Sequence, residues 1–151
     1  MIEELRRESP GLLRELAVIG FNPHVNEELR RRGINIIYGD ITQRDMLVHS
    51  GVADGEILIC TIPNSLIKGA TNVRLLRQLR EINPTAQIIM HADTFLEGQE
   101  LYQAGASFVS LPRLTEAVEL REVILAARNK ILDQKRFASD TKLDGPREVI
   151  P

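Results

Sequence analysis

The side chains that most often perform chemistry in proteins are few and scattered in this sequence. It contains one cysteine, Cys60, and three histidines, His24, His49 and His91. No two histidines stand at metal-ligand spacing from each other or from Cys60, which argues against a metal site. Cys60 lies inside an apolar run without a motif that would supply a base, so we interpret it as a core residue. His24 and His49 are predicted to face solvent. These residues favour a protein that is not an enzyme.

Polar and glycine residues follow several apolar runs, where a parallel sheet would bind a ligand. Gly39-Asp40 follows one run directly, and it equally suits a turn in which Asp40 caps the next helix. Thr61, Ile62 and Pro63 end another run; here the beginning of a helix is favoured over a ligand contact. His91 also stands at the end of a run, and a structural role is favoured for it.

Five short apolar runs, rich in β-branched residues, are bounded by Gly, Pro, Asn or Asp. They are Leu16–Ile19, Asn35–Tyr38, Ile57–Ile62, Gln87–Met90 and Ser107–Leu111. Continuous apolar runs of this length are typical of strands buried on both faces of a parallel sheet. Because helical patterns separate them, the sequence predicts an α/β fold with one predominantly parallel, doubly wound sheet.

The helices between these runs have recognisable ends. Asn22-Pro23 suits the start of one helix and Gly33 its end. Thr42 with Asp45, and Thr94 with Glu97, have capping-box spacing, and Gly51 and Gly105 mark the corresponding ends. The longest internal helix is predicted over Leu66–Ile82. Its Arg74, Arg77 and Arg80 form either a solvated face, which is favoured, or a surface for an anion or a partner.

A final helix is predicted from about Leu114 to Arg136, followed by a polar, flexible tail over Ala138–Pro151. The helix has acidic residues early and basic residues late, which suits the helix dipole. Its apolar face over Leu114–Ile131 is too broad to remain in water. We expect it to pack on its own sheet or on a second subunit.

Composition narrows the class of protein further. The chain has 151 residues, a net charge of −2, no tryptophan and 4% aromatic residues, which makes a general nucleic-acid binder improbable. No apolar run approaches the roughly 18 residues of a membrane span. The charged start lacks the apolar stretch of a signal peptide, and a single cysteine suits a reducing compartment. A cytoplasmic location is therefore predicted.

The region from Val18 to Pro112 resembles the TrkA N-terminal domain, also called the RCK or KTN domain, a Rossmann-type regulatory module of potassium channels, potassium uptake systems and cation:proton antiporters. The resemblance rests on VIGFNP (18–23), RRRGINIIYGDITQRDML (30–47), ILICTIPNSLIKGATN (57–72), RQLREINPTAQII (77–89) and LYQAGASFVSLPRL (101–114). It covers about two-thirds of the chain. The sequence of these segments is most similar to that of domains that follow the membrane part of monovalent-cation antiporters.

This resemblance implies a site for NAD(H) or an adenine nucleotide. The residues that match the family's site are Gly20, Phe21, Asn22, Gly39, Asp40, Ile41, Thr61, Ile62, Pro63 and His91, with Asp40 and Ile41 on the adenine. Asn72 matches a family asparagine and could equally hold a loop. His91 stands where other members carry an arginine that reaches the phosphates.

Two departures from the family pattern affect nucleotide binding. The fifteen residues before Leu16 contain one glycine, Gly11, so the first strand and the GxGxxG phosphate loop are not in this chain. Gly20 stands where the family usually has an acidic residue for the ribose. We therefore predict weak or absent dinucleotide binding by this chain alone.

The leading hypothesis is a non-enzymatic, cytosolic regulatory domain of a potassium or other monovalent-cation transporter, acting by population shift. One alternative is a fragment of an NAD(P)-dependent oxidoreductase of the saccharopine-dehydrogenase-like type, which would need a glycine loop and a substrate domain. Another is a protein-interaction remnant without nucleotide binding.

The predicted organisation has a truncated Rossmann-type domain over residues 1–112, a dimerisation helix over 113–137 and a tail over 138–151. The expected partners are a second copy, through the 114–131 helix, and the membrane part of a transporter on the same or another polypeptide. In the family this helix crosses to the neighbouring subunit. No nucleic-acid partner is expected.

Overall fold

The structure, a computed structural model, describes residues 1–67 and 69–143. The chain divides into two compact units, each described here by itself. One unit contains residues 1–40 and 123–151, and the other contains residues 41–122. The last eight residues of the predicted tail lie outside the described part of the chain.

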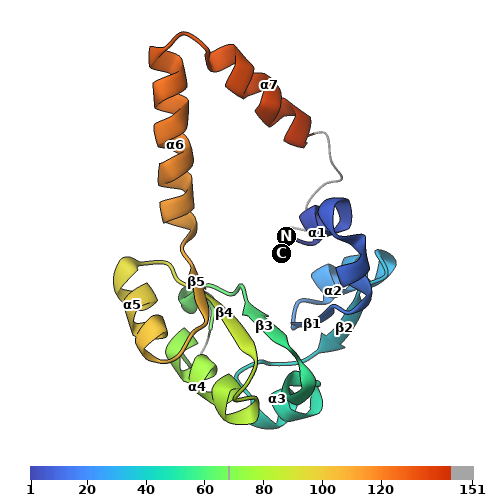
Figure 1. Ribbon diagram of the computed structural model, residues 1–151. Coiled ribbons are helices and arrows are strands. Elements are labelled where there is room, and N and C mark those ends of the chain that lie inside the picture. Colours follow the sequence, from blue (N-terminus) through green and yellow to red (C-terminus); the bar gives the residue numbers. More distant parts are fainter. Residues whose placement is uncertain (68, 144–151) are drawn as a thin grey trace. The chain divides into compact units, whose positions relative to one another are not determined.

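All five predicted strands are present and every pairing between them is parallel. They are β1 (Ala17–Gly20), β2 (Asn35–Tyr38), β3 (Ile57–Cys60), β4 (Gln87–His91) and β5 (Phe108–Ser110). The expectation of parallel strands in an α/β fold is confirmed. The expectation of one sheet is not met, because the strands form two sheets, with the orders β1-β2 and β3-β4-β5 (Figure 1).

A strand between β1 and β3 would be needed to join the two sheets into one. In a doubly wound fold with strand order 3-2-1-4-5-6, the first strand pairs with the second on one side and the fourth on the other. The strands β1 and β3 correspond to the second and the fourth. Among the described residues only helical turns precede β1, so no strand is there to join the two sheets.

Besides the strands, the described residues form ten helical segments (Figure 1). The α-helices are α1 (Ile2–Glu8), α2 (Pro23–Arg31), α3 (Arg44–His49), α4 (Asn72–Ile82), α5 (Phe95–Gln103), α6 (Pro112–Arg128) and α7 (Leu132–Leu143). Single 3₁₀ turns are η1 (Pro10–Arg14), η2 (Val52–Asp54) and η3 (Asn64–Leu66). They alternate with the strands, as the sequence predicts.

Side-chain caps hold the starts of α2 and α5 as predicted. Asn22 accepts hydrogen bonds from the backbone N–H groups of His24 and Val25, at 3.0 and 3.3 Å. Thr94 accepts from the N–H of Glu97 at 3.2 Å. The predicted Thr42 cap is wrong, because α3 starts one residue later and Gln43 occupies its N-cap position without a side-chain hydrogen bond.

The helix predicted over Leu66–Ile82 begins six residues later than expected. Gly69 has φ +73°, a left-handed conformation that interrupts a helix, and Thr71 then caps α4 by accepting from the N–H of Arg74. Leu66 consequently lies in a 3₁₀ turn with an exposed side chain. The sequence pattern missed this break because the apolar spacing continues through it.

The sequence predicts a single final helix, but the structure contains two helices there. The first, α6, ends at Arg128, and Lys130 has φ +58°. The second, α7, begins at Leu132 and includes Ala138–Leu143 of the predicted tail. A lysine in a left-handed conformation is uncommon, and no glycine or proline marks this break in the sequence. The helical pattern of the sequence on either side does not indicate this break.

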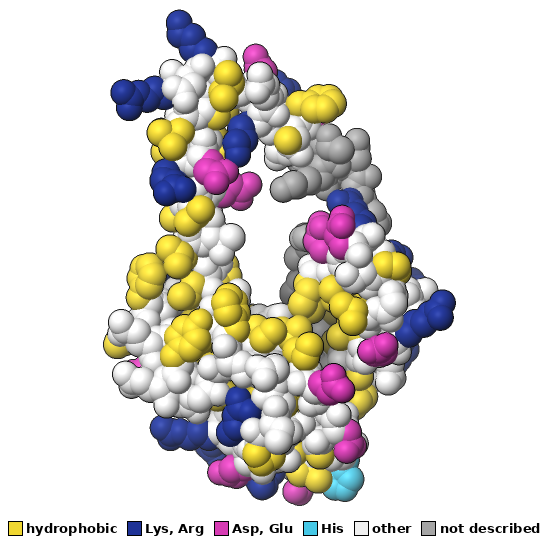
Figure 2. Space-filling view, viewed as in Figure 1, with side chains coloured by type: hydrophobic (Ala, Val, Ile, Leu, Met, Phe, Trp, Pro, Cys, Tyr) yellow, Lys and Arg dark blue, Asp and Glu magenta, His cyan; other side chains and the backbone are white. Residues whose placement is uncertain are grey.

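In the unit of residues 41–122, helices α4 and α5 cover one face of the β3-β4-β5 sheet. Ile88, Met90 and Val109 on this face are buried, together with Leu76 of α4 and Leu101 of α5. The opposite face is apolar but open. Its exposed members are Ile57, Ile59 and Phe108, and Figure 2 shows apolar side chains gathered over this sheet. A parallel sheet is normally covered on both faces.

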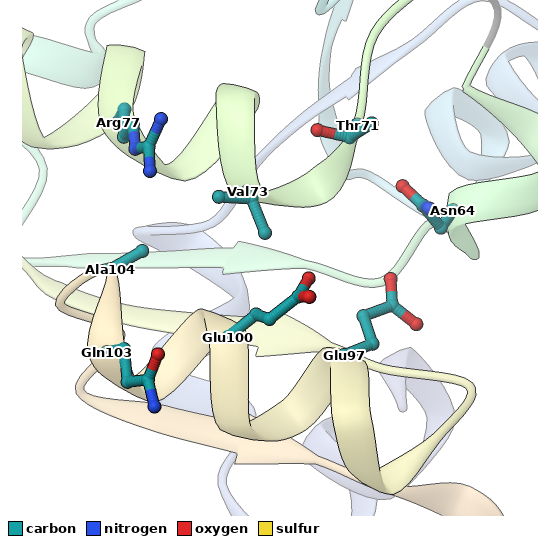
Figure 3. A pocket seen from close by; sticks show the side chains of 8 residues that line it. All are labelled: Asn64, Thr71, Val73, Arg77, Glu97, Glu100, Gln103 and Ala104. Carbon is teal, nitrogen blue, oxygen red and sulfur yellow. The ribbon is translucent and has the colours of Figure 1, made fainter.

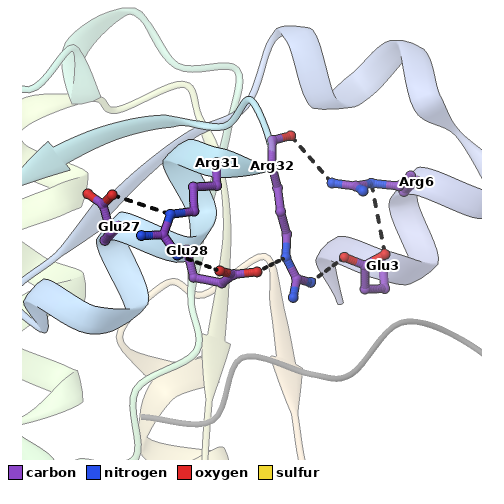
Figure 4. Close-up of polar contacts among 6 residues, drawn as sticks. All are labelled: Glu3, Arg6, Glu27, Glu28, Arg31 and Arg32. Carbon is purple, nitrogen blue, oxygen red and sulfur yellow. Dashed lines mark hydrogen bonds and ion pairs between the residues drawn. The ribbon is translucent and has the colours of Figure 1, made fainter.

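In the other unit, ion pairs attach the first helix to α2 (Figure 4). Arg32, just after α2, donates to Glu28 at 2.9 Å and also pairs with Glu3 of α1. Arg6 of α1 in turn donates to the backbone carbonyl of Arg32 at 3.3 Å. The Arg32 and Glu3 side chains are only 16% and 15% exposed, so this pair is better shielded from water than a typical surface pair.

Candidate functional site

Residues predicted for ligand contact end both strands of the β1-β2 sheet. Gly20 is the last residue of β1, and the N–H of Gly39 after β2 donates to its carbonyl at 3.3 Å. Asn26 of α2, which is 2% exposed, donates to the same carbonyl at 2.9 Å. A Cβ at Gly20 would lie 2.6 Å from the Asn26 amide oxygen. Any larger residue at position 20 would therefore require the Asn26 side chain to shift.

The other candidates in this unit lie around the same strand ends. Phe21 is 55% exposed directly after β1. Asn22 uses its side-chain oxygen to cap α2, so its carboxamide is already engaged. Asp40 is exposed after Gly39. Of these residues, Phe21 presents an exposed aromatic ring at the end of β1.

In the other unit, the remaining candidates gather at the carboxyl ends of β3 and β4. Thr61, Ile62 and Pro63 follow β3 directly and lead into η3, and His91 is the last residue of β4. Ile41, which comes after β2 in the sequence, is the first residue of this unit and is half-buried. Thr61 is exposed, whereas Ile62 and Pro63 are half-buried. The sequence therefore placed these residues at strand ends correctly.

A fully buried asparagine connects these two strand ends. The side-chain amide of Asn72, the first residue of α4, donates to the carbonyls of Ile62 and His91, both at 3.2 Å. Its backbone N–H donates to the Asn64 side chain at 2.8 Å, and the Cys60 thiol donates to its oxygen at 3.7 Å. The structure thus gives Asn72 the role of holding the loop after β3 against the end of β4.

His91 belongs to a short polar chain along the next turn. Its Nε2 lies 3.0 Å from an Asp93 oxygen, and its side chain is 15% exposed. The N–H of Asp93 donates to Glu97 Oε2 at 2.9 Å. The turn between β4 and α5 is therefore tied together by its own side chains, which agrees with the structural role that the sequence favours for His91.

Sequence reasoning missed three residues that shape these edges: Asn26, Asn64 and Asp93. Each is a polar residue close to a strand end, but nothing in the spacing indicates its hydrogen-bond partner. Asn26 lies on the buried face of the amphipathic helix α2, and a polar residue on that face is the only sequence signal that could have pointed to it. The spacing of Asn64 and Asn72, which are eight residues apart and on either side of Gly69, did not suggest a contact either.

The three arginines that recur every three residues on α4 have different surroundings. Arg80 donates to the backbone carbonyls of Ala86 and Gly105, both at 2.8 Å, and of Pro84 at 3.0 Å. It therefore fastens the loops before β4 and β5, and the solvated face predicted for it is wrong. Arg74 and Arg77 are exposed.

Cys60 is buried, as predicted, and burial raises the pKa of its thiol. The folded protein therefore holds the thiol proton more tightly than the unfolded chain does. The contribution of this difference to the free energy of unfolding is complete below the ordinary pKa of a thiol, and it is lost as the pH rises above that value. We expect the free energy of unfolding in urea to fall as the pH rises above about 8.5, the ordinary pKa of a thiol. In Cys60→Ala the fall should be shallower; identical slopes would show that Cys60 does not contribute.

Two further observations bear on the kind of site. Within the described residues, no group of three or more His, Cys, Asp or Glu side chains is arranged to hold a metal ion. The same part of the chain contains no helix that is both long enough and apolar enough to span a membrane.

Parallel strands that alternate with helices, and polar residues at the strands' carboxyl ends, define a Rossmann-like α/β domain. The model of the TrkA-N domain family matches residues 1–112, and the chain belongs to this family. The family resemblance read from the sequence is thus confirmed.

Curated relatives include the glutathione-regulated potassium-efflux system protein KefC of Escherichia coli O139:H28, which is 34% identical over 91 residues. That match covers 60% of this chain and 14% of KefC, so the chain spans only a small part of the relative.

Solved structures of similar fold include the TrkA-N domain of the inner membrane protein ybaL from Escherichia coli. It has a TM-score of 0.63 and 24% identity, and the match covers 76% of this chain and 88% of that one. The GsuK channel bound to NAD matches with a TM-score of 0.54 and 23% identity, over 69% of this chain and 19% of the channel. At these identities, the similarity establishes the fold.

Proposed function

We propose that this chain is a cytosolic regulatory domain of a potassium or other monovalent-cation transport system, and that it is not an enzyme. The observation that carries the proposal is the family match over residues 1–112, and the KefC relative supports it. The domain would favour one conformation of a membrane gate when a ligand or a second copy binds.

Transport measurements test this proposal in the protein as it occurs in the cell. The complete reading frame that contains these residues, with any adjacent membrane-protein gene, is expressed in cells that lack their own potassium-efflux systems. Deletion of residues 18–112 is expected to abolish regulation of potassium flux. A frame that encodes a catalytic substrate domain, with no membrane part in or beside it, would favour the oxidoreductase alternative. Regulation of potassium flux that is unchanged by the deletion would contradict the regulatory role.

We further propose that residues at the carboxyl ends of β1 and β2 in one unit, and of β3 and β4 in the other, contact NAD(H) or an adenine nucleotide. The GsuK structures with NAD and ADP support the ligand class through a similar fold. Phe21, Asp40 and Thr61 offer exposed side chains. The phosphate loop, which would hold the pyrophosphate by backbone N–H groups at a helix N-terminus, is not among these residues.

Isothermal titration of this chain with NAD, NADH, ATP and AMP is therefore expected to show binding weaker than about 100 µM. Without the phosphate loop there are no contacts to the pyrophosphate, and Gly20 supplies no side chain to bind the ribose. Micromolar affinity for any of these nucleotides would show that other residues replace both contributions.

We propose, finally, that two copies associate through α6. The helix exposes Leu114, Val118, Leu120, Ile124 and Leu125, and the open sheet face exposes Ile57, Ile59 and Phe108. Both surfaces are apolar and both require cover. A two-fold pair in which α6 of each copy covers the sheet face of the other would bury both at once.

A further inference from the structure

A pocket of about 340 Å³ lies between α4 and α5, and its Asn64, Thr71 and Glu97 end adjoins the loops that follow β3 and β4. Val73 and Ala104 supply its apolar wall. Figure 3 shows its polar side chains, which are Asn64, Thr71, Arg77, Glu97, Glu100 and Gln103. All of them belong to the unit of residues 41–122, and the volume is within the range of small-molecule sites.

The pocket carries opposite charges on its two helices. Arg77 extends from α4, and Glu100 and Glu97 extend from successive turns of α5 (Figure 3). Arg77 and Glu100 line the same space, yet neither forms an ion pair or side-chain hydrogen bond within the part of the chain that the structure describes. By contrast, Arg80, one turn further along α4, is fully engaged with backbone carbonyls.

Glu97 strengthens the negative character of one end of the pocket. Its Oε2 accepts from the N–H of Asp93. Its Oε1 is buried and has no hydrogen-bond donor among the described residues. A buried carboxylate oxygen without a donor is unfavourable, and a nearby positive charge would relieve that cost. In Figure 3 the Glu97 carboxylate and Arg77 occupy opposite ends of the pocket.

We propose that this pocket binds a free amino acid, with its ammonium group toward Glu97 and Glu100 and its carboxylate toward Arg77. An arginine guanidinium suits a carboxylate because it can donate two parallel hydrogen bonds. A nucleotide fits poorly, since its phosphates would face two carboxylates. A metal ion fits poorly too, since the described residues offer no three-ligand cluster here.

Amide chemical shifts of the ¹⁵N-labelled chain test the proposal directly. The probes are L-alanine, L-glutamine, L-lysine and L-aspartate as zwitterions, with putrescine and succinate as controls that carry only one kind of charge. At least one amino acid is expected to shift the amides of Val73, Glu100 and Ala104 in a saturable way, and the controls are expected to leave them unchanged. Binding of putrescine or succinate as strongly as the best amino acid would overturn the proposal, as would no saturable shift with any amino acid.

Matched variants then test the two ends of the pocket. Arg77→Gln and Glu100→Gln each remove one charge from an exposed side chain, and each is expected to weaken binding at least tenfold. Arg74→Gln removes the same charge one turn earlier on α4, outside the pocket, and is expected to bind as the parent does. The amide spectrum of each variant confirms its fold. Unchanged binding in both pocket variants would show that the ligand sits elsewhere.

Discussion

Replacing Asn72 with leucine is expected to lower the free energy of unfolding by about 3 kcal/mol and the midpoint temperature by about 6–12 °C. Leucine has a similar size but no donor, so the carbonyls of Ile62 and His91 would each lose a hydrogen bond. The Asn72 side chain is completely buried, so water cannot replace those bonds. The cost of unpaired buried groups is therefore expected in full.

Urea and thermal denaturation measure this loss, with Gln78→Leu as the control on the same helix. Gln78 is half-buried and forms no side-chain hydrogen bond within the described residues, and its replacement is expected to change the free energy of unfolding by less than about 0.5 kcal/mol. Amide exchange adds a local measurement: in Asn72→Leu it should accelerate both after β3 and after β4. A loss below about 1 kcal/mol would show that the two carbonyls find other donors.

Substituting glutamate for both Leu120 and Ile124 is expected to dissociate the proposed dimer, raising its dissociation constant at least about 100-fold. These side chains are 53% and 65% exposed and lie one turn apart on α6. Val123, on another side of the helix, is half-buried and is a poorer choice. Glutamate is a good helix former, so α6 itself should persist.

Light scattering across a dilution series measures the association. The control is the Gln78→Glu, Gln99→Glu pair, which adds the same two negative charges on α4 and α5 and should associate like the parent chain. A parent chain that is monomeric at tens of micromolar would disprove the dimer, whereas a persistent dimer in the α6 variant would place the interface elsewhere.

Local sequence signals predicted most of the elements because local energetics determine them. Asn22-Pro23 and Thr94 supply their caps within three residues, and Gly33, Gly51 and Gly105 adopt the left-handed conformations that end helices. Continuous apolar runs likewise indicated parallel strands, since only such strands are buried on both faces. The family resemblance followed from several such segments in fixed order, and the match over residues 1–112 confirmed it.

The tertiary structure alone decided what the polar residues do. Asn72 and Arg80 each satisfy a backbone carbonyl that is distant in sequence, and no local pattern encodes such a partner. Gly20 shows the same limit: the sequence identified a missing carboxylate, and only the structure showed that Asn26 packs against this glycine. Helix ends and strand faces depend on neighbours along the chain, whereas hydrogen-bond partners depend on which segments the fold brings together, and that is determined only when the whole unit has packed.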